Sequence, residues 1–395
     1  MTDFLRYLIG GAAFLLLFPV TVLFAEVVFS LTRSDDPRRE EGERRRVAVL
    51  MPAHDEASII AGTLRSITPQ LASSDRLVVV ADNCSDETDA IAKSEGAEVL
   101  VRTDLTRRGK GYALDHGVRH LAQDAPEIVI IIDADCQVAA GSIDKLARLS
   151  AQTGRPVQAL YLMHTDKGAN LNMRIAEFAF TVKNQVRPLG LRRLGLPCQL
   201  MGTGMAFPWG CISSATLATG HIVEDLKLGI DLARAGRPPL FCPDALVTSN
   251  FSASREGASS QRTRWEHGHI GLILSDAPRL FLESAVKLDF NLLALAFDLS
   301  VPPLALLAFM DMLIWIASAC FFVATRIQIP LIIATASAAL FAASILLSWR
   351  RYGQHIISLG NLGFAVLYAI MKIPLYAKFL VARQIGWVRS KRDQE

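Results

Sequence analysis

The sequence lacks paired cysteines, a strong net charge and internal repeats, and each absence excludes a class of protein. Its six cysteines are scattered and none belongs to a C-x-x-C pair. That spacing fits free thiols in a reducing compartment better than a disulfide framework or a zinc site. The formal net charge is only +3, so the chain lacks the excess of basic residues that is typical of a nucleic-acid-binding protein. Without a repeated segment, a solenoid is excluded as well.

Apolar residues are what the chain has in abundance. Of its 395 residues, 51% are hydrophobic, and the mean hydropathy is +0.31, which is too high for a purely soluble protein. Residues 8–25 are uncharged, and the apolar run continues past Glu26 to Leu31. This run can cross a hydrocarbon core of about 30 Å and is longer than the core of a cleaved signal peptide. We therefore predict an N-terminal transmembrane helix over residues 1–32.

The C-terminal third is also apolar. Residues 300–324, 327–349 and 352–371 contain one charged residue in total, Asp311, so we expect two or three spanning helices and a polar partner for Asp311. Pro302 and Pro303 leave open a tight hairpin instead of one long helix. Residues 278–288 mix charge with apolar side chains, as an interfacial helix does. The basic tail at 372–392 is typical of a cytoplasmic headgroup layer.

Arginines beside the first apolar helix predict the orientation of the chain. Residues 33–46 contain six arginines among five acids, and an excess of basic residues next to a first membrane helix places that side in the cytoplasm. We therefore predict a cytosolic domain over residues 45–275, followed by interfacial and transmembrane helices over 276–395.

The cytosolic domain has the pattern of an α/β fold. Short apolar strands at 47–51, 77–81, 99–101 and 128–132 alternate with helical segments, which predicts a doubly wound, mainly parallel sheet. The polar residues after these strands then converge on one crevice at the carboxyl ends of the strands. They are Asp55, Asp82, Lys110, Asp133 and Asp135.

Two acids follow the most apolar of these strands. Residues 128–132 are five β-branched residues without alternation, the pattern of a strand buried on both faces. Because side chains alternate along a strand, Asp133 and Asp135 project to the same side. Paired carboxylates suit Mg²⁺ or Mn²⁺, which complete their coordination with water or a substrate's phosphates.

Two helices carry further polar groups. Glu224 and Asp225 open an amphipathic helix that ends near Gly236. Farther along, Gln261, Arg264 and Trp265 are spaced i, i+3 and i+4, so they share one helix face.

Five stretches together resemble the motifs of the family 2 glycosyltransferases: residues 52–56, 82–86, 133–135, 223–225 and 261–265. The flanking apolar helices are similar to those of its membrane-embedded branch, which includes cellulose and hyaluronan synthases. Residues 109–114, 198–200 and 202–205 look most like a bacterial exopolysaccharide-synthesis subgroup of the methanolan type. The resemblance implies a GT-A-like nucleotide-sugar fold in the bacterial inner membrane. It also implies inverting, metal-dependent transfer from a UDP-sugar to a saccharide or lipid-linked acceptor.

The resemblance also implies roles for single residues. Asp225 matches the general base and Glu224 stands beside it, although Val223 replaces the threonine of the family motif. Asp133 and Asp135 would hold the Mg²⁺ or Mn²⁺ ion. The implied acceptor contacts are Trp265, Gly204 and Met205. The implied donor contacts are Asp55, Glu56, Asp82, Lys110, Asp133, Asp135, Gln261 and Arg264.

Plainer interpretations exist for four of these positions. Asp82 can be a helix cap, Lys110 a solvated loop lysine, and Asp225 a helix N-cap, where the helix dipole favours the carboxylate and weakens it as a base. Residues 261–265 can form an interfacial helix with a snorkelling arginine.

At the level of function, two alternatives remain. One is a lipid glycosyltransferase of the ceramide or hopanoid kind, and the other is a non-catalytic membrane subunit that binds nucleotide sugar. Membrane lipids and other exopolysaccharide-assembly proteins are the further partners that we expect.

Overall fold

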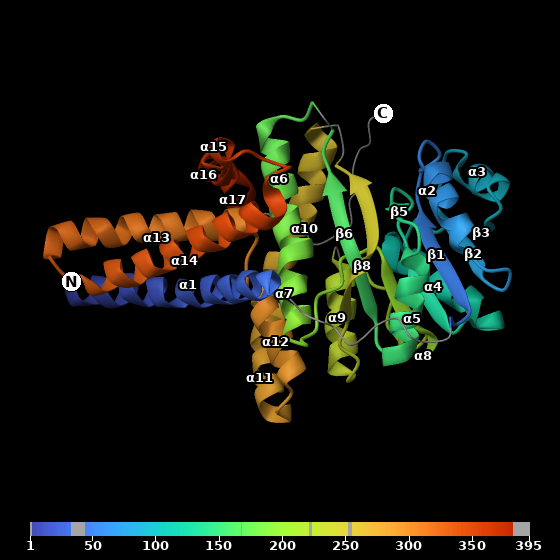
Figure 1. Cartoon of the computed structure of the whole chain (residues 1–395), viewed down its shortest axis with the longest axis horizontal. Helices are drawn as coiled ribbons and strands as arrows, with labels where there is room; N and C mark the ends of the chain where they lie inside the picture. The colour runs from blue at the N-terminus through green and yellow to red at the C-terminus, as the bar shows by residue number, and fades with distance from the viewer. Residues whose placement is uncertain (1, 33–43, 167, 221–222, 252–254, 382–395) are drawn as a thin grey trace. The chain divides into compact units, whose positions relative to one another are not determined.

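The computed structural model describes residues 2–32, 44–166, 168–220, 223–251 and 255–381. The chain forms two compact units (Figure 1). The helical unit contains Met1–Ser34, Lys167–Gly195 and Glu266–Gln384, and the sheet unit contains Asp35–Asp166, Leu196–Trp265 and Ile385–Glu395. Residues 167–195, inside the domain predicted over 45–275, thus belong to the helical unit. The arginines at 33, 38 and 39 and the basic residues beyond 381 lie outside the described residues.

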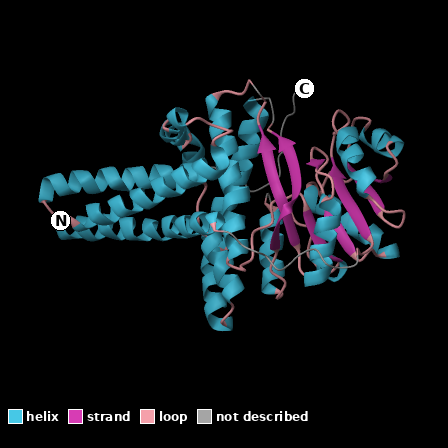
Figure 2. Ribbon diagram, in the orientation of Figure 1, coloured by secondary structure: helices cyan, strands magenta, loops and turns pink. Residues whose placement is uncertain are grey.

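The sheet unit is built on one eight-stranded sheet of order β3-β2-β1-β4-β7-β6-β8-β5. Four neighbouring strands are parallel, whereas β7 is antiparallel to both of its neighbours. Figure 2 shows these strands as arrows with helices packed along them. The α/β class and the mainly parallel sheet are therefore confirmed. The strands are β1 Val47–Ala53, β2 Arg76–Asp82, β3 Glu98–Arg102, β4 Ile128–Ile131, β5 Gln137–Val138, β6 Val157–His164, β7 Met205–Pro208 and β8 Leu240–Asn250.

The core of this unit lies between the parallel strands and helix α4, Lys110–Leu121. Leu50 and Val80 are fully buried, as are Val129 and Ile131 of the central strand, because strands covered on both faces select β-branched and aliphatic residues throughout. The other helical segments of the unit are α2 Ile60–Ile67, η1 Thr68–Gln70, α3 Thr88–Ser94, η2 Ala122–Asp124, α5 Ser142–Thr153, α8 Trp209–Ile212 and α9 Glu224–Arg234.

Strand β8 extends well beyond the short apolar run at residues 240–242. It pairs with β6 from Leu240 to Cys242 and again from Leu246 to Asn250, with a shift of register between Ala159 and Leu160. Pro243 and Asp244 interrupt the apolar pattern at this irregularity, which is where a proline is tolerated inside a sheet.

Among its described residues, the helical unit contains four helices that are long and apolar enough to cross a membrane: Thr2–Leu31, Leu304–Thr325, Ile329–Gly353 and Leu359–Phe379. Three of them are C-terminal, and the last consists of shorter helical pieces. Pro302 and Pro303 separate the short apolar helix α12 from α13. The elements are α1 Thr2–Leu31, α6 Leu171–Thr181, η3 Val182–Val186, α7 Arg187–Arg193, α11 Ala277–Lys287, α12 Phe290–Leu299, α13 Leu304–Thr325, α14 Ile329–Ser348, η4 Trp349–Gly353, α15 Leu359–Leu362, α16 Ala365–Met371 and α17 Ile373–Val381. Helix α10, Arg255–Ser275, begins in the sheet unit and ends in the helical unit.

A buried ion-pair triad joins three helices of this unit. Arg187 on α7 donates from Nε to Glu26 Oε2 of α1 at 2.6 Å and from Nη2 to the carbonyl oxygen of Asp298 on α12, also at 2.6 Å. The Asp298 carboxylate also pairs with Arg187, and all three side chains are less than 8% exposed. Glu26 interrupts the apolar run of α1, and its burial would be very costly without a partner. Arg187 is that buried cationic partner.

Two further polar groups of the helical unit have internal partners. Ser337 of α14 donates to Asp311 Oδ1 of α13 at 2.6 Å, which is the kind of partner expected for an acid in an apolar run. The ring of His269 in α10 contacts the carbonyl oxygen of Leu299, and burial lowers the pKa of this histidine to about 3. It is therefore neutral.

We predict that Gly190→Ala destabilises the helical unit. Gly190 lies one turn beyond Arg187, and a Cβ at this position would overlap the carbonyl oxygen of Glu26, forcing α7 away from α1 and straining the triad. We expect a lower melting temperature, with a cost of about 1–3 kcal/mol or more, measured by thermal unfolding in detergent. Gly11→Ala in α1 is the control, because a Cβ there meets open space. Equal melting of the two variants would contradict close packing at Gly190.

Candidate functional site

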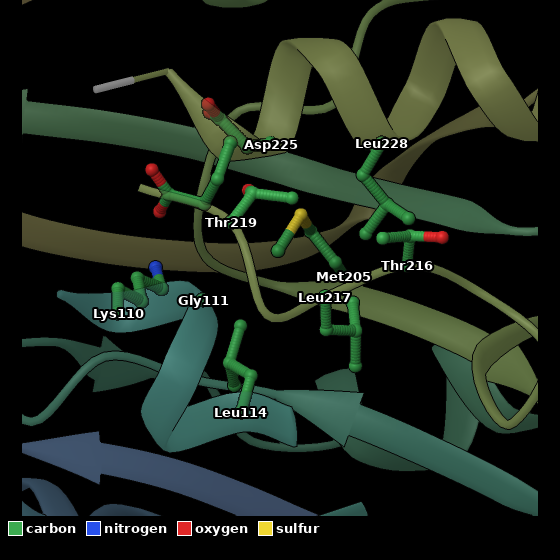
Figure 3. Close-up of a pocket in the computed structure, with 10 residues that line it drawn as sticks. Lys110, Gly111, Leu114, Met205, Thr216, Leu217, Thr219, Asp225 and Leu228 are labelled. Carbon is green, nitrogen blue, oxygen red and sulfur yellow. The ribbon is translucent and has the colours of Figure 1, made fainter. Parts of the chain in front are cut away.

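The candidate site is a small pocket between the start of α4, the start of α9 and the chain that joins α8 to α9. Figure 3 shows Lys110 and Asp225 at one side of this pocket, with Leu217 and Leu228 at the other. The site thus has a charged side and an apolar side. The lining residues are Lys110, Gly111, Leu114, Met205, Thr216, Leu217, Thr219, Glu224, Asp225 and Leu228.

Lys110 is the centre of the charged side. Its Nζ lies 2.5 Å from Asp133 Oδ1 and donates to the carbonyl oxygen of Gly202 at 2.7 Å. Burial disfavours the ammonium, but Asp133, Glu224 and Asp225 outweigh this and raise the pKa of Lys110. The lysine is therefore a partly buried cation held by acids from two elements, and not a solvated loop lysine.

The loop over residues 201–204 is held in shape by a buried amide. Gln158 of β6 is fully buried; it accepts the N–H of Met201 at 2.8 Å and donates to the carbonyl oxygen of Thr203 at 2.9 Å. Thr203 Oγ1 in turn accepts the backbone N–H of Asp133 at 3.0 Å. Gln158 was missed by sequence reasoning, and the available signal was an amide in an otherwise apolar strand.

The glycines of this loop serve backbone geometry. Gly202 and Gly204 have φ of +91° and +65°, a region that other residues rarely adopt. Gly204 is buried, and a Cβ there would lie 2.8 Å from that of Ala159. Of the two loop residues expected to contact an acceptor, the structure places Met205 in the pocket wall and Gly204 inside the sheet packing.

Two adjacent acids begin helix α9. The pKa of Glu224 is raised to about 7, mainly by burial and then by the charge of Asp225, while Lys110 and Arg264 oppose the shift. The N-cap of this helix is Val223, which makes no side-chain capping bond. Asp225 is therefore not the N-cap of α9, and it lines the pocket instead.

Asp133 and Asp135 follow β4 directly and fit a divalent cation. Burial raises the pKa of Asp133, which Lys110 opposes. Asp133 Oδ1 is buried and accepts no hydrogen bond of regular geometry from the described residues, so its contact with Lys110 is an ion pair. Carboxylate oxygens are the ligands that Mg²⁺ and Mn²⁺ prefer, and the Asp133 loop is fixed from behind by Thr63, which donates to the carbonyl oxygen of Ala134 at 2.7 Å.

A second polar cluster occupies the ends of β1 and β2. Asp82 is buried and pairs with Arg102 at 2.5 Å, so it does not cap α3. Asp55, at φ +53°, accepts the N–H of Ser85 at 2.6 Å. The backbone N–H of Glu56 donates to Thr88 Oγ1 at 2.8 Å. Because β2, β1 and β4 are parallel neighbours, this cluster and Asp133 lie along the same edge of the sheet.

Asp55, Cys84 and Asp86 bring three potential metal-ligand atoms within 4.8 Å of one another. Burial raises the pKa of Cys84 to about 11, so its thiol is protonated at neutral pH. Asp86 accepts N–H groups from Ala57 and Thr88. These groups therefore tie two loops together, and we do not regard them as a metal centre.

Gln261, Arg264 and Trp265 lie on α10 and are partly buried. Arg264 is near enough to Glu224 to lower its pKa, which joins this helix electrostatically to the acids of α9. Of the site residues expected from sequence, the structure thus brings together Lys110, Asp133, Glu224, Asp225 and Arg264.

Comparisons with known proteins give a consistent family. A model described as glycosyltransferase like family 2 matches residues 44–268. The uncharacterised protein MJ1222 of Methanocaldococcus jannaschii is 33% identical over 26% of this chain and 40% of its own length. The probable glycosyltransferase YdaM of Bacillus subtilis is 24% identical over 65% of this chain and 62% of its own. The chain therefore spans less than two thirds of either relative.

Among solved structures, the mannosyltransferase PcManGT from Pyrobaculum calidifontis, in complex with GDP-Man and Mn²⁺, has a similar fold. The TM-score is 0.52 and the identity 16%, over 97% of this chain and 99% of that one.

We predict that Glu224→Gln stabilises the protein in a pH-dependent way. A folded-state pKa of about 7, above the unfolded value of 4.5, means that the folded state binds more protons between these values, so stability falls as pH rises through this window. Glutamine cannot ionise, so the variant does not lose stability in this window. The loss in the wild type is at most about 3 kcal/mol.

The melting-temperature gain of Glu224→Gln over the wild type should therefore be near zero at pH 4.5 and largest above pH 7.5. Glu87→Gln, at an exposed position of the same unit, is the control. A melting-temperature gain that does not change with pH would refute the raised pKa of Glu224.

Proposed function

We propose, from the premise that this chain belongs to the family described as glycosyltransferase like family 2, that it transfers a hexose from a nucleotide sugar to a saccharide or lipid-linked acceptor. The donor is a UDP-sugar, the configuration at the sugar is inverted, and the reaction serves exopolysaccharide synthesis at the cytosolic face of a bacterial inner membrane. The observation that carries this proposal is the convergence of Lys110 and the Glu224–Asp225 pair on one pocket, with Asp133 ion-paired to the same lysine.

On the donor side, Asp133 and Asp135 would hold Mg²⁺ or Mn²⁺, and the ion would supply positive charge to the leaving diphosphate. A neighbour of similar fold is described with GDP-Man and Mn²⁺, which supports this assignment. Lys110 and Arg264 add positive charge at the same place, with Gln261 as an amide donor. The nucleoside is held by Asp55, Glu56 and Asp82 at the ends of β1 and β2.

On the acceptor side, Asp225 takes the proton of the attacking hydroxyl, as a general base must. Burial keeps Glu224 partly protonated at neutral pH, so we assign the base to its neighbour and a hydrogen-bonding role to Glu224. Trp265 offers an aromatic face to the acceptor sugar. Met205 lines the pocket, and Gly204 shapes the loop beside it.

The four apolar helices support a multi-pass membrane protein, with lipids and other exopolysaccharide-assembly proteins as partners and no role for nucleic acid. The glycosyltransferase domain that we propose covers residues 45–275. The same helices also suit a lipid acceptor of the ceramide or hopanoid kind, and analysis of the product from a panel of acceptors separates the two. A non-catalytic subunit has no use for a base, and the Glu224–Asp225 pair argues against it.

We predict that donor binding depends on Asp135 and on a divalent ion. Calorimetry with a UDP-sugar should show binding that weakens roughly 10- to 100-fold in Asp135→Ala or with EDTA, the value of one or two charge-assisted contacts. Asp144→Ala, on helix α5 away from the pocket, is the matched control. Undiminished affinity in both cases would contradict the metal site.

We further predict that Asp225→Asn lowers sugar transfer by roughly 10²- to 10⁴-fold, which is the usual contribution of a general base. Donor affinity should be retained, because asparagine has the same size and the donor contacts lie elsewhere. Transfer at the wild-type rate would show that Asp225 is not the base.

A further inference from the structure

Lys110 places a positive charge where the proposed divalent ion also needs to act. Its ammonium lies 2.5 Å from Asp133 Oδ1, and the negative charges of Glu224 and Asp225 stabilise it. The space is narrow: a Cβ added at Gly202 would lie 3.4 Å from Asp225 Oδ2 and 3.8 Å from Lys110 Nζ. The acids of the pocket therefore already have a cation, supplied by the chain itself.

An ammonium and a divalent ion cannot both use Asp133 without repelling each other. Magnesium lies about 2.1 Å from its oxygen ligands, so an ion on the oxygen that Lys110 approaches to 2.5 Å would stand within about 5 Å of Nζ. At that distance, in a partly buried site, like charges interact strongly. The donor's diphosphate is the one substrate group with enough negative charge to hold both cations.

We propose that Lys110 is a built-in counter-ion that competes with the divalent ion for Asp133 until the donor's diphosphate draws the ammonium away. The inference rests on the proposed function. Its consequence is cooperativity: the ion alone binds weakly, the nucleoside diphosphate strengthens it, and the ion strengthens the nucleotide by the same factor. The pocket thereby avoids holding a bare metal ion without a donor.

The local structure lets the side chain move while its backbone stays fixed. Lys110 is the first residue of the twelve-residue helix α4, and a Cβ at Gly111 would overlap the carbonyl oxygen of Leu217, so the helix start is packed tightly. The lysine side chain is 19% exposed and consists of flexible methylenes. It can therefore turn from Asp133 to a phosphate without a shift of the helix.

The test measures Mn²⁺ binding to the detergent-solubilised full chain, without nucleotide, from the electron paramagnetic resonance signal of free Mn²⁺. Lys110→Met should bind Mn²⁺ about 5- to 150-fold more tightly than the wild type, the usual range of coupling between two ligands. Lys110→Arg keeps the charge and should stay close to the wild type. Lys227→Met removes a lysine of α9 that pairs with Asp231 and should leave Mn²⁺ affinity unchanged.

With UDP present, the wild type should gain Mn²⁺ affinity, and Lys110→Met should gain less. If Lys110→Met binds Mn²⁺ alone no more tightly than the wild type, while UDP still promotes binding, the competition is refuted and the proposed function stands. If no protein binds Mn²⁺ with or without UDP, the metal-dependent function fails and the inference with it.

Should Lys110→Met not fold, the double variant with Asp225→Asn retains the charge balance. Its Mn²⁺ affinity is then compared with that of Asp225→Asn alone, and the same increase is expected.

Discussion

The ion pair between Lys110 and Asp133 is the contact on which the arrangement of the site depends. It joins the first residue of α4 to the loop after β4, and the same ammonium holds the carbonyl oxygen of Gly202. The 201–204 loop is fixed in turn by Gln158. Four segments far apart in sequence therefore share one cation, which offsets the repulsion between Asp133 and the acids that begin α9.

Much of the fold could be predicted because its signals are local. Each parallel strand is a short apolar run, and each is followed by polar residues that meet at one edge of the sheet. Asp133 and Lys110 were found in this way, whereas Asp225 was named from the resemblance of residues 223–225 to a family motif. Gln158 was not found, because its role comes from its burial beside a loop more than 40 residues away. The spacing of residues along the chain does not reveal such a contact. The full length of β8 was hidden for a similar reason, since its second half depends on pairing across a bulge.

The site also shows how burial changes an acid at the start of a helix. The pKa of Glu224 is raised to about 7, first by burial and then by the charge of the adjacent Asp225. Sequence reasoning could name both residues from a resemblance. It could not give the shift of Glu224, because that shift comes from the burial of its carboxyl and from the charges of Asp225, Lys110 and Arg264.

The triad of Glu26, Arg187 and Asp298 has a consequence for how the protein is made. Glu26 and Arg187 are separated by 161 positions, and Arg187 and Asp298 by 111. At about 5–20 residues per second, a ribosome needs roughly 8–32 s after Glu26 before its cationic partner exists at all. During that interval the nascent N-terminal helix carries an unpaired carboxyl within an apolar run. Helix α1 is thus synthesised well before the two residues that complete its buried ion pairs, and it reaches its final packing only after Asp298 has been made.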